Sequence, residues 1–348
     1  MNSVSLTDAK RPLLPPPRGA AEQSRQGGWF STASICCAAY LVSGVSQPLV
    51  MSAVKHAGLG DTSCQVYMLP YYVGMIACGV LGPPLKEIRW QQLGLHRCVI
   101  TALLGAIAQN LNYAGNMHAG SSIFAVVYQS VTIWSAVFSR VLLDKKLNLD
   151  QWLGVWLVFL GLAMTGLGAR SSGDAVLKGA IMVLLGAGMH ALTHVMSEAL
   201  SSSKSKYEKV HPALNCCVQG ITSTIVVGAW QVFYTLREDV WENQVMAPAR
   251  EAGTTLTQAV MLLGAVAIGN LVHAGAFFFL LAHIGAISAS VLKAVQAVAV
   301  FVLAHLLFCG IDPAQCITSL KALSLLVVLL GVRRYTSATN AKQAAGKV

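Results

Sequence analysis

Charged side chains are scarce in this sequence. Only 11% of its 348 residues are Asp, Glu, Lys or Arg, whereas a typical soluble domain contains about 25%. Hydrophobic residues make up 55% of the chain, and stretches such as 153–167 carry no charge at all. Such apolar stretches have to face lipid or one another. The composition therefore excludes a soluble globular protein and predicts an integral membrane protein.

Metal-ligand spacings are absent as well. The nine cysteines form no Cys-x-x-Cys motif and no Cys/His ligand pattern, and two adjacent pairs, at 36–37 and 216–217, lie inside apolar runs. In a sequence, zinc sites are usually recognised by closely spaced ligands of these types. We therefore expect no metal site and no cofactor. No Asn-x-Ser/Thr sequon is present to identify a lumenal loop.

Apolar segments of spanning length dominate what is present. Residues 1–27 contain four prolines and four basic residues, and we expect them to form a disordered cytosolic tail. Each apolar segment that follows is near the ~20 residues that cross a bilayer core. The segments are approximately 29–54, 66–84, 95–115, 120–143, 151–169, 176–199, 213–235, 255–282, 286–308 and 317–335. The sequence thus predicts ten transmembrane helices and a second short cytosolic tail over 337–348.

The distribution of Lys and Arg supports this count. With both termini in the cytosol, 17 basic residues fall on the cytosolic side. The other side receives five, namely Lys55, Arg170, Lys178, Arg237 and Arg250. This bias agrees with the positive-inside rule. The formal charge of +10 is therefore mainly topological, and we expect no nucleic-acid partner. On the non-cytosolic side, the sequence leaves undecided whether one disulfide bond forms among Cys64, Cys309 and Cys316.

The two halves of the chain align with each other at an offset of 164. The segment 125–142 matches 289–306, and Tyr128-Gln129 falls on Leu292-Lys293. Five helices per half is an odd number, so the halves have to lie in opposite orientations. The predicted fold is therefore all-α, with ten transmembrane helices in two inverted repeats, 28–169 and 170–336. Inverted repeats are typical of transporters whose site lies near the midplane.

Part of the first repeat resembles a known family. The sequence is similar to the nucleotide-sugar transporters of the drug/metabolite transporter superfamily, in particular the branch for CMP-sialic acid and UDP-galactose. Two departures occur, because the family's Tyr-Gln-Leu-Lys continues here with Ser130 and Val131, and its Asn before Ile-Leu-Lys is Ser290. The matching residues are Asn110-Leu111-Asn112-Tyr113, Tyr128-Gln129, Ala136-Val137-Phe138-Ser139, Leu147, Gln151-Trp152, Gly161, Val291-Leu292-Lys293-Ala294, Gly331-Val332 and Tyr335.

Lys293 is the main candidate for substrate binding. It lies well inside an apolar helix, where an unpaired ammonium costs at least a few kcal/mol, and no Asp or Glu is expected at its depth. An anionic phosphate would satisfy it, and the family resemblance implies a lysine at this position. The alternative is that Lys293 snorkels, or pairs with backbone carbonyls and Gln129.

Polar neighbours of Lys293 complete the predicted site. Gln129 is its repeat equivalent, Tyr128 offers an aromatic face and a hydroxyl, and Gln296 shares its helix face. Amides at Gln109, Asn112 and Asn270 can read a base or sugar hydroxyls, although bonds between helices are their commoner role. His190 and His194 are one turn apart, and we expect them to serve packing rather than metal binding or proton relay.

The sequence predicts a transporter rather than an enzyme. The resemblance implies exchange of a nucleotide sugar for a nucleotide monophosphate by alternating access, in a Golgi or endoplasmic reticulum membrane. The rival hypothesis is a sugar-phosphate or other organic-anion carrier of the same superfamily. An integral-membrane enzyme is a second rival, for which only His190 and His194 offer chemistry. The expected partners are the anionic substrate and the lipid bilayer, and a homodimer stays open.

Overall fold

The computed structural model describes residues 18–83, 94–143, 147–171, 173–201 and 209–345. The chain divides into two compact units, Met1–Ile35 and Cys36–Val348. In the first unit the chain is helical from Arg18 onward, whereas the sequence predicted a disordered tail through residue 27. Ala20, Ala21 and Glu22 are strong helix formers and favour this early start. The predicted domain boundaries stay predictions.

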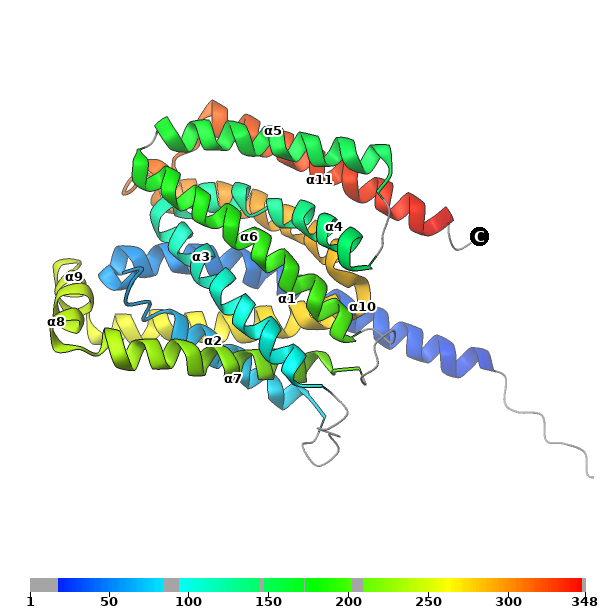
Figure 1. The fold of residues 1–348 in the computed structure, drawn as a ribbon, viewed down its shortest axis with the longest axis horizontal. Coiled ribbons are helices and arrows are strands. Elements are labelled where there is room, and N and C mark those ends of the chain that lie inside the picture. Colours follow the sequence, from blue (N-terminus) through cyan, green and yellow to red (C-terminus); the bar gives the residue numbers. More distant parts are fainter. Residues whose placement is uncertain (1–17, 84–93, 144–146, 172, 202–208, 346–348) are drawn as a thin grey trace, which may run out of the picture. The chain divides into compact units, whose positions relative to one another are not determined.

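The described residues are helical apart from turns and connections, with no strand among them (Figure 1). Short π- and 3-10 segments extend several helices. The α-helices are α1 (Arg18–Val54), α2 (Met68–Ala77), α3 (His96–Val127), α4 (Ser130–Leu143), α5 (Leu149–Ser171), α6 (Asp174–Ser201), α7 (Pro212–Trp230), α8 (Glu238–Trp241), α9 (Ala247–Glu251), α10 (Leu256–Phe308) and α11 (Ser319–Ala345).

Several of these helices are long and apolar enough to cross a membrane. Among the described residues four qualify alone, and α3 with α4 adds a fifth as a pair bent by 60°. Three further apolar helices are shorter, at Met68–Leu81, Leu149–Thr165 and Val295–Phe308. The four helices that qualify alone are Ser34–Leu59, Asp174–Leu200, Pro212–Thr235 and Leu256–His283. The all-helical membrane fold is thus as expected, and the exact count of ten stays a prediction.

Helix α10 joins two predicted spans in one continuous helical segment. It contains 53 residues, whereas a bilayer core is crossed by ~20. Figure 1 shows its yellow first part and its orange second part running along different lines. The gap at 283–285, between the predicted segments 255–282 and 286–308, lies within helical backbone. These three residues contain neither Pro nor a residue with positive φ.

Three helix pairs hold the second unit together. Helix α2 packs on α7, α3 on α6, and α5 on α11. Small residues permit close backbone approach: a Cβ on Gly154 of α5 would lie 2.8 Å from the carbonyl oxygen of Gly331 on α11. Pairs α2/α7 and α5/α11 join helices at matching positions of the two predicted halves, which is the packing that a two-fold related pair of repeats would produce.

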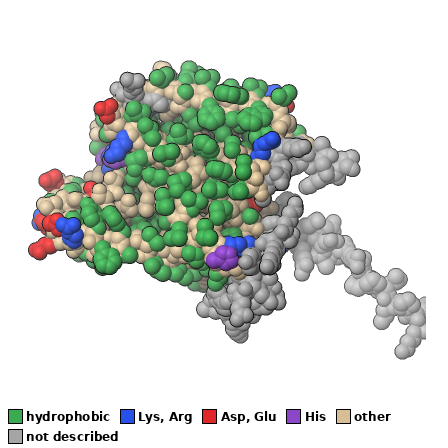
Figure 2. Space-filling model, viewed as in Figure 1, with side chains coloured by type: hydrophobic (Ala, Val, Ile, Leu, Met, Phe, Trp, Pro, Cys, Tyr) green, Lys and Arg blue, Asp and Glu red, His purple; other side chains and the backbone are tan. Residues whose placement is uncertain are grey.

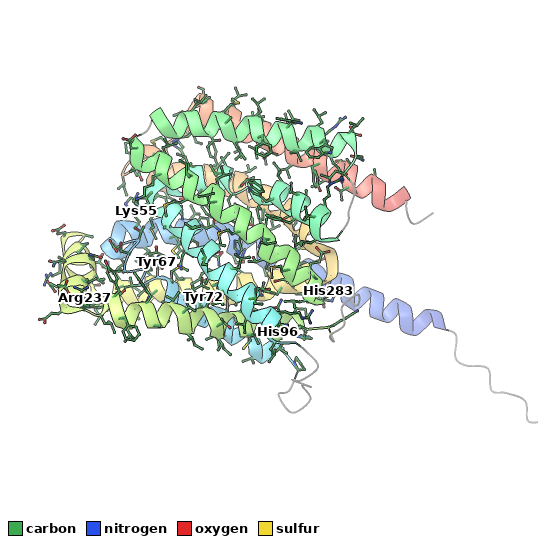
Figure 3. The ribbon with its side chains drawn as sticks, viewed as in Figure 1. Lys55, Tyr67, Tyr72, His96, Arg237 and His283 are labelled. Carbon is green, nitrogen blue, oxygen red and sulfur yellow. A yellow bond between two sulfur atoms is a disulfide. The ribbon has the colours of Figure 1, made fainter. Side chains whose placement is uncertain are left out.

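Charged side chains of the second unit gather at its two ends. Figure 2 shows Lys, Arg, Asp, Glu and His at the margins, while hydrophobic side chains cover the broad middle of the visible face. Figure 3 places Lys55 and Arg237 at one end and His96 and His283 at the other. An apolar belt between two charged ends is what a bilayer requires. Lys55 and Arg237 share the end that the sequence predicts to be non-cytosolic.

The connection between α10 and α11 is tied down by several contacts. Cys309 and Cys316 form a disulfide, whereas Cys64 is a free thiol. The Asp312 carboxylate pairs with Lys55 at 3.2 Å. A ring nitrogen of His305 and the two sulfur atoms all lie within 4.8 Å of one another. Since the sulfurs are bonded to each other, they are not the thiolates that metal ions bind.

Candidate functional site

A cavity of about 120 Å³ lies among helices α1, α2, α3, α6, α7 and α10. Sequence reasoning placed a site between the Tyr128-Gln129 segment and Lys293, and the structure brings these elements together there. All seven predicted site residues line this cavity: Gln109, Asn112, Tyr128, Gln129, Asn270, Lys293 and Gln296. Their contact with a substrate stays a prediction.

Lys293 is the cation of the cavity. Its side chain is only 6% exposed, and its Nζ donates to the Tyr128 hydroxyl at 3.1 Å. The ammonium also lies 4.6 Å from the centre of the Tyr128 ring and 5.5 Å from that of Phe277. Aromatic faces attract cations, but they do not neutralise them. Since no Asp or Glu occurs among the described lining residues, the positive charge is left available to an anion.

The helix carrying Tyr128 and Gln129 is broken at these two residues. They form a turn between α3 and α4, where Val131 N and Thr132 N bond to carbonyls three residues back. Gln129 fills part of the break, because its Nε2 donates to the carbonyls of Ala125 at 3.3 Å and of Lys293 at 3.1 Å. The break thus places both Tyr128 and Gln129 in the cavity lining.

His190 is a cavity residue that the sequence interpretation assigned to packing. Its Nδ1 lies 2.7 Å from the Tyr128 hydroxyl oxygen and 3.4 Å from Asn112 Nδ2. The His190 and His194 rings are 4.6 Å apart, and both residues line the cavity. The signal that could have found them is their spacing of one helical turn on a span otherwise free of charge at mid-depth. A third histidine, His273, also lines the cavity.

His273 and Phe277 of α10 form one wall of the cavity, and Tyr40, which is not a lining residue, packs against both rings. Tyr40 of α1 stacks on His273 at 4.7 Å and on Phe277 at 5.7 Å between ring centres. Ser43 fixes the His273 ring through a contact of 3.2 Å between Oγ and Nδ1. Among the described residues, the Tyr40 hydroxyl is buried without a hydrogen-bond partner. Flat aromatic faces such as those of His273 and Phe277 suit a planar ligand.

Apart from Gln129, the four predicted amides divide into two kinds. Asn270 is fully used, because its Nδ2 donates to Tyr71 O at 2.7 Å and its Oδ1 accepts from Gln47 Nε2 at 2.9 Å. Gln296 is committed through Nε2 to the Tyr40 carbonyl at 2.7 Å. In contrast, Asn112 Oδ1 and Gln109 Oε1 are buried without a partner in the described part of the chain. The α3 amides are therefore better placed to receive a ligand than Asn270.

Substituting Asn270 by alanine should mainly reduce the stability of the protein, because its amide is already bonded to other helices. The change leaves the Tyr71 carbonyl and the Gln47 amide unpaired in a buried site, which costs ~1–3 kcal/mol. We expect a clear fall in the thermal unfolding temperature of the purified protein. Asn243→Ala is the matched control, since Asn243 is exposed and donates one bond to the Asp239 carbonyl. Equal unfolding temperatures for the two variants would contradict the bridging role of Asn270.

The cavity reaches towards the end of the second unit that carries His96 and His283. Lining residues Ala102 and Phe278 are close in sequence to these two histidines. On the opposite side the lining of α1 stops at Pro48. Beyond it, Ser52 Oγ contacts Ser121 Oγ at 2.7 Å, and Lys55 pairs with Asp312. The contacts that close the bundle are thus on the Lys55 side of the cavity.

Comparison with known proteins supports a transporter fold. Residues 53–167 match the family model of the EamA-like transporter family, and this segment lies within the first predicted repeat. No curated protein matches the chain. Among solved structures 26 chains match. One of them, described only as "Crystal structure of protein", superimposes with a TM-score of 0.56 at 13% identity, covering 88% of this chain and 97% of its own. This last likeness concerns the fold alone.

Proposed function

We propose that this protein is a membrane transporter that moves a small organic anion by alternating access. The observation that carries the proposal is Lys293, a buried cation in a central cavity whose described lining contains no carboxylate. Its partners there are a hydroxyl group and aromatic faces. The apolar belt of the second unit (Figure 2) and the match of 53–167 to EamA-like transporters support membrane transport of small molecules.

A nucleotide sugar is the substrate that we propose. Its phosphate supplies compact negative charge for Lys293, and its base can stack on the aromatic wall formed by His273 and Phe277. The unpartnered oxygens of Gln109 and Asn112 can accept bonds from sugar hydroxyls or an exocyclic amine. The resemblance of the Tyr128-Gln129 and Lys293 segments to nucleotide-sugar transporters points in the same direction.

Exchange for a nucleotide monophosphate follows from the same charge. If the empty carrier reorients with its lysine unpaired, the crossing exposes a bare cation to a medium of low dielectric constant, which is slow. A bound nucleotide on the return path removes that barrier. We place this antiporter in a Golgi or endoplasmic reticulum membrane with both termini in the cytosol, as the charge bias and the resemblance suggest.

A sugar-phosphate or other organic-anion carrier is the competing proposal. The same lysine would hold its phosphate, but the aromatic wall would have no base to stack on. An enzyme is less well supported, because the Tyr128 hydroxyl, which lies next to His190, also accepts a hydrogen bond from Lys293, and the family model that matches 53–167 is one of transporters.

Uptake by reconstituted vesicles tests the function. Vesicles loaded with UMP or CMP should accumulate one nucleotide sugar from a panel at least about tenfold faster than empty vesicles, because the loaded carrier returns without a bare cation. Sugar phosphates at the same concentration serve as the matched competitors. Uptake that is equally fast into empty vesicles would contradict exchange. Uptake of sugar phosphates in preference to every nucleotide sugar would contradict the substrate class.

A further inference from the structure

We propose that His190 takes up one proton when the cavity binds an anion with two negative charges. The inference rests on the proposed function, since it concerns a nucleotide sugar bound at Lys293. His190 would then match the charge of the site to the charge of the substrate, so that the loaded cavity is electrically neutral when the carrier reorients.

The positive charge of the described lining is smaller than the negative charge of the substrate. Lys293 is the single Lys or Arg among these residues, and no Asp or Glu accompanies it. A nucleotide sugar carries two negative charges, either on two phosphoryl groups or on one phosphoryl group and a carboxylate. Lys293 therefore balances one charge and leaves the second uncompensated. An uncompensated charge in a cavity at membrane depth is costly, so a second positive charge is needed in the loaded state.

Only the histidines can supply that charge near neutral pH. Tyrosines begin to titrate near pH 10, whereas an ordinary histidine titrates at about 6.5. Over their described residues, α4 and α5 bring no titratable side chain into the lining. The charged and titratable lining groups are Tyr71 and Tyr72 of α2, Tyr113 of α3, Tyr128 of the turn before α4, His190 and His194 of α6, and His273 and Lys293 of α10.

Geometry selects His190 among the three histidines. It is joined to the cation by a short chain of contacts, from Lys293 Nζ to Tyr128 Oη at 3.1 Å and from Tyr128 Oη to His190 Nδ1 at 2.7 Å. His194 contacts this chain only through ring packing on His190 and Phe277. The contacts of His273 are instead with Ser43 and Tyr40.

The empty site keeps His190 neutral. Because Lys293 donates to the Tyr128 oxygen, the tyrosine hydrogen is placed to donate to His190 Nδ1, which therefore acts as an acceptor. The lysine charge nearby also disfavours a second cation. A bound anion cancels that charge and reverses the balance.

Loading would rearrange the two contacts of His190 Nδ1, with the Tyr128 hydroxyl and with Asn112 Nδ2. Once Nδ1 carries a proton, it no longer accepts from the Asn112 amide. A proton passes from bulk water or buffer to His190 Nδ1, which becomes a donor to the Tyr128 oxygen. The hydrogen of the Tyr128 hydroxyl is then released from His190 and can donate to a substrate oxygen. The proton supplied by the medium thus adds one positive charge and also frees one donor for the anion, and both changes favour the loaded state.

Calorimetric titration of the purified full-length protein counts this proton. The probes are UDP-galactose and CMP-sialic acid, whose two negative charges do not titrate near neutral pH. Binding in HEPES and in Tris should release different heats, because the buffers differ in ionisation enthalpy, and the difference should correspond to about one proton taken up. The dissociation constant should rise by up to about tenfold per pH unit towards alkaline pH, since the proton becomes scarcer.

His190→Gln and His273→Gln form the matched pair of variants. The first should lose both the buffer dependence and the pH dependence, whereas the second should keep both. Binding with equal heats in the two buffers by the unsubstituted protein would overturn the proposal while leaving the nucleotide-sugar function intact. Loss of proton uptake in His194→Gln or His273→Gln, with uptake kept in His190→Gln, would overturn the assignment to His190. Absence of binding by both probes would instead contradict the proposed function itself.

Discussion

Replacing Lys293 by methionine should reduce uptake of the anionic substrate by roughly 10- to 100-fold. Hydrogen bonds to charged groups contribute about 1.5–3 kcal/mol, and each 1.4 kcal/mol corresponds to about a factor of ten in affinity. Methionine keeps the length of the side chain but removes the ammonium. Because the lysine is buried and its described surroundings lack a carboxylate, the thermal unfolding temperature should stay equal or rise. Vesicle uptake and thermal unfolding are measured on the same preparation.

Lys321→Met is the control for this experiment. Lys321 is also buried, at 4% exposed, but its Nζ donates to the carbonyls of Ala314 at 2.8 Å and Cys316 at 3.0 Å, outside the cavity lining. Its loss should lower stability while leaving uptake per folded molecule within about twofold, because no ligand contact changes. Similar uptake by Lys293→Met and Lys321→Met would remove Lys293 from the anion site.

Substituting Gly120 by alanine should destabilise the protein by ~2 kcal/mol or more. Gly120 interrupts α3 with φ 78° and ψ 160°, a conformation that residues with a side chain rarely adopt. A Cβ there would lie only 2.0 Å from Nε2 of Gln315, a fully buried residue that accepts a hydrogen bond from Ser122 N. Strain and steric overlap therefore add. Thermal unfolding of the purified variant measures the loss.

Two further variants separate these causes. Gly264→Ala, in α10, is the control, since no atom lies within 4 Å of its added Cβ, and its unfolding temperature should not fall. Combining Gly120→Ala with Gln315→Ala removes the steric overlap but keeps the backbone strain, so that only part of the stability should return relative to Gln315→Ala alone. An unfolding temperature of Gly120→Ala equal to that of Gly264→Ala would refute the account.

The proximity of Gln129 and Lys293 was indicated by the internal repeat that the sequence predicts. Gln129 and Lys293 align at the offset of 164, and the structure places Gln129 Nε2 3.1 Å from the Lys293 carbonyl. Apolar helices also announce their length directly, since each has to match the bilayer. These two signals sufficed to locate the cavity between Tyr128 and Lys293.

Other features depend on local geometry that the sequence does not encode plainly. The break at Tyr128-Gln129 occurs without Pro or Gly at those positions, so hydropathy gives no warning of it. The hydrogen bond of His190 to Tyr128 joins residues that are 62 apart in sequence. Asn270 looked equivalent to the other amides until its two bonds to Tyr71 and Gln47 became visible. Which amides remain available to a ligand is thus a property of packing.

The disulfide between Cys309 and Cys316 bears on the orientation of the bundle in the membrane. Disulfide bonds persist in oxidising compartments, whereas the cytosol keeps thiols reduced. This bond lies in the same connection as Asp312, the partner of Lys55, and Figure 3 places Lys55 at the end opposite His96 and His283. Redox chemistry therefore favours a lumenal or extracellular position for the Lys55 end. That orientation agrees with the Lys and Arg distribution, in which Lys55 also falls on the non-cytosolic side.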